Sequence, residues 1–187
     1  SRSGEVRRMA GVFGEAVAQL NAQSGPIEIV VPAVPRLAPL VREAVTSWRV
    51  RARIVVDTAE KDAAFRTARA ALTKSGTATL ELAVAGVPMV AAYKVPLFEE
   101  LIARLMIKVD TAILANLVLG EKVVPEFLQR DCTPERLASA LLPLLSDTPE
   151  RRAQTAALAG LDAVMGIGLT SPAARAAALV LAAGRPV

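Results

Sequence analysis

The sequence predicts an α/β fold in which a parallel sheet is covered by helices on both faces, a doubly wound arrangement. Two patterns predict it: segments with apolar residues at helical spacing alternate with short β-branched runs, and those runs are apolar along their whole length. The chain has 187 residues, of which 53% are hydrophobic and 21% charged, as is typical of one well-packed domain.

The alternation accounts for the first half of the chain. Apolar spacing indicates the helices, and β-branched runs indicate the strands. Thr58 is expected to cap the third helix, and Gly86 with Pro88 beyond it is expected to end the fourth. The expected order is helix 5–23, strand 27–32, helix 36–48, strand 53–57, helix 58–69, strand 70–74, helix 75–86 and strand 88–94.

The second half is expected to be mainly helical. An amphipathic helix is predicted over 96–108, and its charges of mixed sign favour a core-facing role over a membrane-surface role. Residues 109–127 look irregular, with Asn116 and Gly120 as turn signals. Further helices are predicted over 133–147, 148–166 and 171–184, and the first two begin with Thr-Pro-Glu, which is typical of a capped helix start.

The residue inventory excludes several chemistries within this chain. Histidine is absent and Cys132 is the only cysteine, so the sequence offers no intrachain disulfide, no His-based zinc site and no Ser-His-Asp triad. Aromatic residues make up 3%, which argues against a base-stacking surface for nucleic acid. The net charge of +4 suits a phosphate-bearing partner or an anionic membrane, but the scattered Lys and Arg favour an ordinary mixed surface.

The most informative stretch is SGTATLELAVAGVP, residues 75–88. It follows a predicted strand and enters a helix, so it is expected at the carboxyl edge of the sheet, where open α/β sheets bind ligands. Gly76 allows a close backbone approach, and the N–H groups of the helix start, with the Ser75 and Thr77 hydroxyls, can bind phosphate oxygens. The alternative is a purely structural turn in which Ser75 caps the helix.

Glu81 is the only acid in this stretch. A capping box would need Ser or Thr three residues earlier, where Ala78 stands. A carboxylate one turn inside the helix can instead accept hydrogen bonds from the two hydroxyls of a ribose. The alternative is an exposed acid that the helix dipole favours.

This spacing of Ser-Gly, Glu, Gly and Pro resembles the donor site of GT-B glycosyltransferases, which are built from Rossmann-like halves. KSGTATLELAVAGVPMVAAYKV and LANLVLGEKVVPEFLQRDCTPERLASALLPLL resemble the lipid-A-disaccharide synthase family more closely, and the opening SRSGEVRRM resembles that family's GSR-x-x-E turn. The resemblance covers nearly the whole chain, although residues 24–70 are weakly diagnostic. It implies that residues 1–187 are the C-terminal, UDP-sugar-binding half of such an enzyme.

The resemblance also implies roles for individual residues. Arg2 would neutralise the donor diphosphate as the leaving group departs, a task that suits an always-charged guanidinium with paired donors; without the resemblance, Arg2 is a frayed terminal residue. Glu81 would bind the ribose. The diphosphate turn would be lined by Ser75, Gly76, Thr77 and Thr79.

Two further positions match the family less completely. Asn116 corresponds to the Asn of a Leu-Pro-Asn turn near the donor, with Ala115 in place of the Pro, and an ordinary turn residue is the alternative. Tyr93 and Lys94 match a Tyr-basic pair of no assigned role. No metal and no cofactor is expected besides the UDP-sugar substrate.

By the same resemblance, the intact enzyme joins UDP-2,3-diacylglucosamine to 2,3-diacylglucosamine 1-phosphate with inversion, forming lipid A disaccharide 1-phosphate and UDP. The acceptor site and the general base would belong to an N-terminal half outside this chain, so we expect the chain alone to be inactive. The lipid substrates imply peripheral association with the cytoplasmic face of the inner membrane of a Gram-negative bacterium.

Two other functions stay open at this point. One is a different UDP-sugar enzyme of the same fold, such as a UDP-N-acetylglucosamine 2-epimerase or another glycosyltransferase. The other is a non-catalytic nucleotide-binding module. Activity with an acylated donor, and not with a water-soluble one, would favour the lipid-A-disaccharide synthase family over another UDP-sugar enzyme. Failure of the chain to restore sugar transfer when the missing half is added would favour a non-catalytic module.

Overall fold

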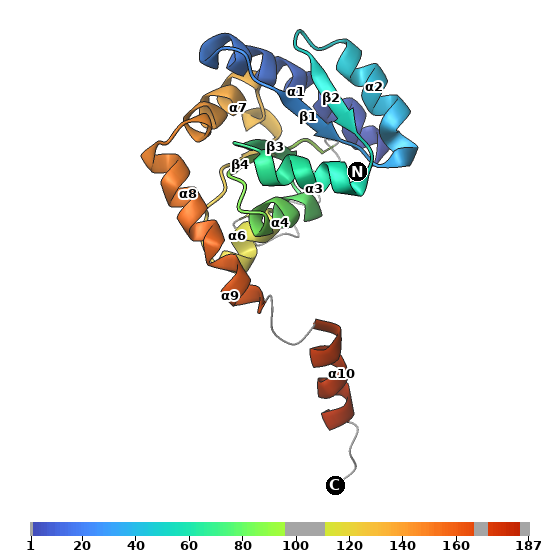
Figure 1. The fold of residues 1–187 in the computed structure, drawn as a ribbon, viewed down its shortest axis with the longest axis vertical. Helices are drawn as coiled ribbons and strands as arrows, with labels where there is room; N and C mark the ends of the chain where they lie inside the picture. Colours follow the sequence, from blue (N-terminus) through green and yellow to red (C-terminus); the bar gives the residue numbers. More distant parts are fainter. Residues whose placement is uncertain (1, 96–110, 167–171, 184–187) are drawn as a thin grey trace.

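The computed structural model describes residues 2–95, 111–166 and 172–183 (Figure 1). Each strand in these ranges runs parallel to the strand it pairs with, so the predicted α/β class is confirmed. The strands form a two-stranded sheet in the order β1-β2 and a three-stranded sheet in the order β3-β4-β5. Their bounds are β1 Ile29–Pro32, β2 Ala52–Val55, β3 Ala71–Lys74, β4 Met89–Tyr93 and β5 Glu126–Leu128.

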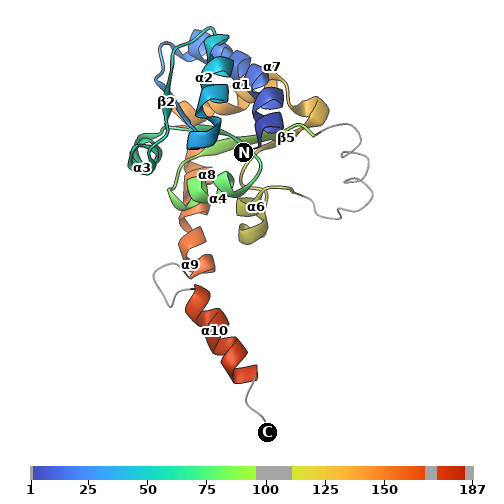
Figure 2. The same ribbon diagram turned by 90° about the vertical axis from the view of Figure 1, so that its right-hand side faces the viewer.

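Helices connect these strands and cover them. Figure 2 shows α1, α2 and α7 on one side of the three-stranded sheet and α4, α6 and α9 on the other. The described α-helices are α1 Ser3–Ser24, α2 Ala38–Thr46, α3 Thr58–Thr67, α4 Thr77–Val84, α6 Leu114–Leu119, α7 Pro134–Leu141, α8 Pro149–Ala159, α9 Leu161–Met165 and α10 Pro172–Ala183. Short 3-10 helices cover Pro35–Leu37, Gln129–Asp131 and Leu142–Leu145.

The central strand β4 separates two hydrophobic cores. Val90 and Ala92 belong to the core that includes residues of α1 and α7. Met89 and Ala91 belong to the core that includes residues of α4, α6, α8 and α9. All four residues are fully buried. Successive residues of a strand point to opposite faces, so the uninterrupted apolar run MVAA is what a strand between two helical layers requires.

Side-chain caps explain where several helices begin, and one of the predicted caps is at the wrong residue. The predicted cap at Thr58 is wrong: Asp57 caps α3, and its Oδ1 accepts hydrogen bonds from the N–H groups of Ala59 at 2.8 Å and Glu60 at 3.1 Å. Asp57 comes immediately before the first helical residue, where a side-chain acceptor reaches those N–H groups. Thr133 and Thr148 cap α7 and α8 as their Thr-Pro-Glu starts predict.

The segment predicted to be irregular contains a helix and a strand. α6 has six residues and β5 has three, and both are too short for periodicity to reveal them. Asn116 therefore lies inside a helix and not at a turn, whereas Gly120 does end that helix with a φ of 73°. The predicted helix over 96–108 lies outside the described residues. The predicted helix over 148–166 is divided into α8 and α9 at Gly160.

The last described helix, α10, lies apart from both cores in the two views (Figures 1 and 2). Its Leu179, Val180 and Leu181 are 71–72% exposed. Among the described helices, none combines the length and the apolar character needed to cross a membrane.

Two glycines of α1 provide a test of the packing between α1 and Trp48, which follows α2. A Cβ added to the buried Gly14 would lie 2.4 Å from Cδ1 of Trp48, whereas a Cβ added to Gly11 meets nothing within 4 Å. We expect Gly14→Ala to lower the free energy of unfolding by about 1–3 kcal/mol through overpacking. Gly11→Ala should raise it by about 0.5–1 kcal/mol through helix propensity.

Urea denaturation followed by circular dichroism measures both changes. Gly11→Ala is the matched control because it makes the same substitution in the same helix. Equal stability of the two variants would contradict the close packing of Trp48 on Gly14.

Candidate functional site

The turn between β3 and α4 forms the centre of the candidate site. It lies where β3 ends, at the carboxyl edge of the three-stranded sheet, as predicted. Gly76 is the N-cap residue of α4 and has φ 147° and ψ −165°, a backbone conformation that residues with a Cβ rarely adopt. The turn therefore depends on glycine at this position.

The three hydroxyls of the turn have different surroundings. Ser75 is buried, and its Oγ donates to the carbonyl oxygen of Ala112 at 2.7 Å, so Ser75 does not cap α4. Thr79 is fully buried, and its Oγ1 donates to the carbonyl oxygen of Gly76 at 2.7 Å. Thr77 is exposed at the first position of α4. Ser75 and Thr79 thus shape the turn, and Thr77 is accessible together with the start of the helix.

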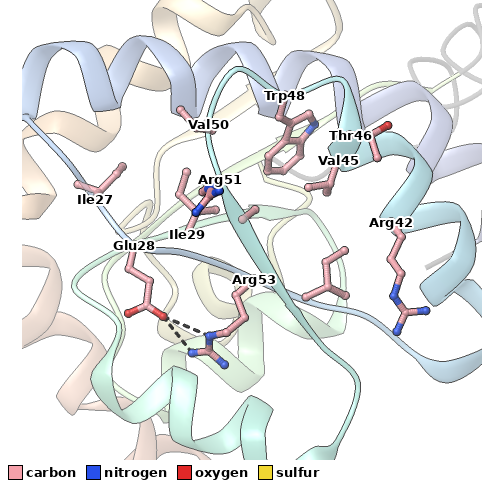
Figure 3. Close-up of a pocket in the computed structure, with 12 residues that line it drawn as sticks. Ile27, Glu28, Ile29, Arg42, Val45, Thr46, Trp48, Val50, Arg51 and Arg53 are labelled. Atoms are coloured by element: carbon pink, nitrogen blue, oxygen red, sulfur yellow. Dashed lines mark hydrogen bonds and ion pairs between the residues drawn. The ribbon is translucent and has the colours of Figure 1, made fainter.

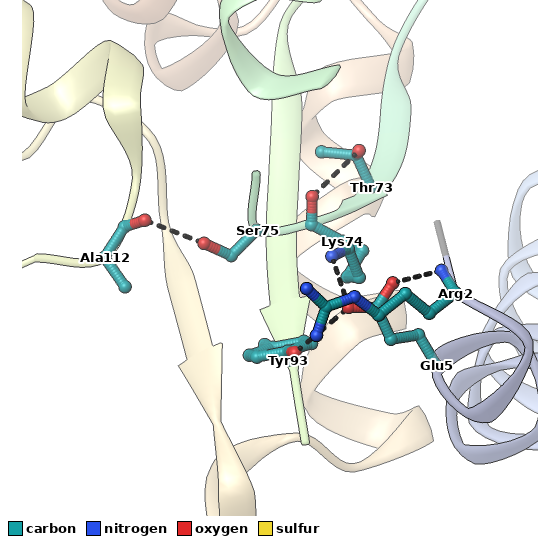
Figure 4. Close-up of polar contacts among 7 residues, drawn as sticks. All are labelled: Arg2, Glu5, Thr73, Lys74, Ser75, Tyr93 and Ala112. Carbon is teal, nitrogen blue, oxygen red and sulfur yellow. Dashed lines mark hydrogen bonds and ion pairs between the residues drawn. The ribbon is translucent and has the colours of Figure 1, made fainter. Parts of the chain in front are cut away.

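A cluster of charged residues connects the start of α1 to this turn (Figure 4). Glu5 Oε2 accepts a hydrogen bond from the backbone N–H of Arg2 at 2.7 Å, so Arg2 lies at an ordered helix start. Glu5 Oε1 accepts from Lys74 Nζ at 3.1 Å and from the Tyr93 hydroxyl at 3.3 Å. The Lys74 ammonium also lies 4.9 Å from the centre of the Tyr93 ring. Arg2 and Lys74 thus share Glu5 as a partner, and Lys74 directly precedes Ser75.

The pKa of Glu5 is lower than that of an ordinary glutamate. Burial opposes ionisation, since only 12% of the side chain is exposed. The hydrogen bond from the Arg2 backbone, the hydrogen bond and positive charge of Lys74, and the Tyr93 hydroxyl together outweigh burial and lower the pKa. Glu5 is therefore a charged group at neutral pH, with partners on three segments of the chain.

Glu81 takes part in an ion pair. Its Oε2 accepts a hydrogen bond from Lys61 Nζ at 2.8 Å, and half of its side-chain surface is exposed. Lys61 lies on α3 and also has its ammonium 5.5 Å from the centre of the Phe65 ring. The hydrogen bond to Glu81 raises the pKa of Lys61. Glu81 is thus accessible, but it has a structural partner that its position in the sequence did not reveal.

Asn116 lies in a different environment from the other predicted residues. It is 2% exposed; its Nδ2 donates to the Val124 carbonyl at 3.0 Å, and its Oδ1 accepts from the Val124 N–H at 2.8 Å. Nδ2 also lies 3.3 Å from Thr111 Oγ1. Thr111 is followed by Ala112, whose carbonyl oxygen accepts the hydrogen bond of Ser75. Asn116 is therefore connected to the turn through the segment that contains Thr111 and Ala112.

Glu126 of β5 completes this second network. Its carboxylate accepts hydrogen bonds from Thr111 Oγ1 at 2.9 Å and from the Ala112 N–H at 2.9 Å. Sequence reasoning missed Glu126, and it also missed the partnership of Glu5 with Lys74. The only sequence signal for Lys74 is its position as the last residue of a strand that ends at the ligand-binding edge.

Two hollows lined by described residues differ in their relation to this edge. A depression of about 580 Å³ is lined by Lys61, Thr77 and Glu81 among others, and so adjoins the turn. A larger one, of about 750 Å³, lies beside β1 and β2 and carries the ion pair between Glu28 and Arg53 (Figure 3). None of the predicted site residues lines the larger hollow. We therefore place the candidate site at the carboxyl edge and not in the hollow beside β1 and β2.

The fold and the site define a class: an α/β protein with polar and cationic groups gathered at the carboxyl edge of a parallel sheet. A family model described as Lipid-A-disaccharide synthetase matches residues 1–168. The chain is 51% identical over 185 residues to lipid-A-disaccharide synthase of Bradyrhizobium diazoefficiens and 52% identical over 181 residues to that of Nitrobacter hamburgensis. The chain belongs to the lipid-A-disaccharide synthase family, a family of glycosyltransferases in lipid A biosynthesis.

The matches cover most of this chain and less than half of each relative. They span 99% of the chain and 47% of the Bradyrhizobium protein, and 97% of the chain and 46% of the Nitrobacter protein. The synthase of Granulibacter bethesdensis is 41% identical over 84% of the chain and 40% of its own length. The chain therefore spans about half the length of the curated relatives it matches.

The contacts of Asn116 predict a structural role that can be measured. Asn116→Ala leaves the N–H and carbonyl groups of Val124 without their side-chain partner in a buried site, so we expect it to lower the free energy of unfolding by about 2–4 kcal/mol. Asn21→Ala is the matched control, because it removes a single half-buried acceptor of the Ile27 N–H. It should cost about 1 kcal/mol.

Urea unfolding of both variants measures the difference. If Asn116→Ala were as stable as the wild type but bound nucleotide more weakly, Asn116 would be a ligand-binding residue and not a support for the turn.

The lowered pKa of Glu5 predicts a pH-dependent contribution to stability. The folded-state pKa is below the unfolded value of about 4.3, so the contribution of ionised Glu5 is fully present above that value and is lost as the pH falls through the folded-state pKa. The difference in free energy of unfolding between wild type and Glu5→Gln should therefore be constant near neutral pH and shrink below about pH 4.

Chemical denaturation at a series of pH values tests this expectation. Glu15→Gln removes an exposed acid from the same helix and serves as the control. A wild-type advantage over Glu5→Gln that grew as the pH fell would show that the sign is wrong.

Proposed function

We propose that this chain is the C-terminal, donor-binding half of an inverting glycosyltransferase that acts on UDP-2,3-diacylglucosamine. The observation that carries the proposal is that Glu5 joins the backbone N–H of Arg2 to Lys74, the residue before the Ser75-Gly76 turn, in a member of the lipid-A-disaccharide synthase family. A guanidinium, an accessible threonine hydroxyl and the start of a helix are groups that bind a diphosphate. Family membership favours this reading over a 2-epimerase.

In the proposed reaction, a hydroxyl oxygen of 2,3-diacylglucosamine 1-phosphate attacks the anomeric carbon of the donor sugar. The bond from that carbon to the UDP oxygen breaks, its electron pair leaves with UDP, and the hydroxyl proton passes to a general base. Arg2 and the start of α4 stabilise the negative charge that develops on the diphosphate. Ser75, Gly76 and Thr79 give the turn its shape, Thr77 contributes its hydroxyl, and Glu81 binds the ribose.

The remaining parts of the reaction belong, on this proposal, to another part of the enzyme. The acceptor site and the general base lie in an N-terminal half, and the chain alone does not transfer sugar. The acylated substrates place the enzyme at the cytoplasmic face of the inner membrane as a peripheral protein. Asn116 acts at the donor site indirectly, through the segment that accepts the Ser75 hydrogen bond.

Calorimetric titration of UDP into the full-length protein, with ADP as a control ligand, tests the donor site. We expect selective UDP binding that weakens about 10- to 100-fold in Glu81→Ala, because two ribose hydroxyls lose a charged hydrogen-bond acceptor. Asp62→Ala is the matched control: its carboxylate also lies beside Lys61, at 3.9 Å, and has the same 50% exposure as that of Glu81.

A further variant separates ribose binding from loss of the ion pair. Lys61→Met breaks the contact with Glu81 but retains the carboxylate, so UDP affinity should stay within about threefold of wild type. If Lys61→Met weakened UDP as much as Glu81→Ala, the ribose role of Glu81 would be wrong. Absence of UDP binding in the wild type would overturn the donor-binding proposal itself.

A further inference from the structure

We infer that Lys74 is a second diphosphate-binding cation of the donor site, held in place by Glu5 and Tyr93. The inference rests on the proposed function and adds a residue to it. Lys74 is the last residue of β3 and directly precedes the Ser75-Gly76 turn, so its side chain starts at the edge where the diphosphate is proposed to bind.

The ammonium of Lys74 lies over the turn. A Cβ built on Gly76 would lie 3.7 Å from Lys74 Nζ and 3.8 Å from its Cε, so the end of the side chain lies beside Gly76, two residues further along the chain. The side chain is 25% exposed, so it is not sealed inside the core. Two contacts hold the ammonium of Lys74 in this position: the 3.1 Å hydrogen bond to Glu5 and the face of the Tyr93 ring.

The charges of the cluster favour an anion. The Glu5 carboxylate pairs with one cationic side chain, that of Lys74, and with the backbone N–H of Arg2, whose guanidinium adds a second positive charge to the cluster (Figure 4). An ammonium has several N–H donors, and the hydrogen bond to Glu5 uses one of them, so others remain for phosphate oxygens. The cluster therefore carries an excess positive charge where a diphosphate would add negative charge.

A purely structural ion pair is the competing explanation. Glu5 and Lys74 join α1 to β3, and such a pair stabilises the fold whether or not a ligand binds. The two explanations differ in what the ligand must contain. A structural role affects all ligands of the site alike, whereas a diphosphate-binding role affects UDP and leaves uridine unchanged.

Titrations of UDP and uridine into full-length wild type, Lys74→Met, Lys74→Gln and Lys74→Arg test the inference. UDP affinity is measured by calorimetry and uridine affinity by ligand-observed NMR. We expect Lys74→Met and Lys74→Gln to weaken UDP at least about tenfold with uridine unchanged, and Lys74→Arg to retain most of the affinity for UDP. Lys74→Gln keeps a donor for Glu5, so it remains informative if Lys74→Met does not fold.

Lys122→Met is the control, because Lys122 is an exposed lysine in the segment that precedes β5. Its UDP affinity should equal that of the wild type. If the Lys74 variants bound UDP as the wild type does, or lost UDP and uridine affinity equally, the inference would be wrong and the proposed function would stand. If the wild type did not bind UDP, the proposed function would fail and this inference with it.

Discussion

The hydrogen bonds to the Glu5 carboxylate hold together three segments that are far apart in the chain. Arg2 belongs to the start of α1, Lys74 follows Glu5 by 69 residues, and Tyr93 follows it by 88 residues. A carboxylate that is mostly removed from water needs charged or hydrogen-bonding partners, and all three are present. These hydrogen bonds join the start of α1 to the carboxyl edge of the sheet, in addition to the apolar packing of α1 in the core that it shares with α7.

A second constraint acts on the other side of the turn. Ser75 donates to Ala112, and Glu126 accepts hydrogen bonds from Thr111 and from the Ala112 N–H. These hydrogen bonds join the segment at 111–113 both to the turn after β3 and to β5. The small polar residues of the turn are thus used largely for shape. On the proposed function, the donor is contacted by the helix start, Thr77, Glu81 and the neighbouring cations.

The sequence predicted the fold class and most elements of the first half, because long helices and fully buried parallel strands have strong apolar patterns. α6 and β5 could not be predicted in this way, since elements of six and three residues contain too few positions for a period to be seen. Asn116 was therefore assigned to a turn, although its amide is enclosed by Val124 and Thr111.

The place of the candidate site in the fold could be predicted from the order of strands and helices along the chain. Ser75, Gly76 and Thr77 follow a parallel strand and begin a helix, and the structure has them at the carboxyl edge. The partners of these residues were not predictable, because a contact between residues 5 and 74 depends on how α1 packs and not on local spacing. Ser75 illustrates the limit: its hydroxyl was a possible cap, and the fold uses it as a donor to Ala112.

The contacts of Glu81 and of Asn116 differ in how much they contribute to the stability of the fold. The ion pair between Glu81 and Lys61 is half exposed on the acid side, and pairs of this kind contribute about 0.2–1 kcal/mol. Ribose hydroxyls can therefore replace or share the Lys61 contact at small cost, and Glu81 is free to serve a ligand. The buried hydrogen bonds of Asn116 to Val124 are worth several times more, because breaking them leaves backbone groups unpaired. Asn116 therefore has a structural role, whereas the half-exposed carboxylate of Glu81 can exchange its ion pair for hydrogen bonds to a ribose.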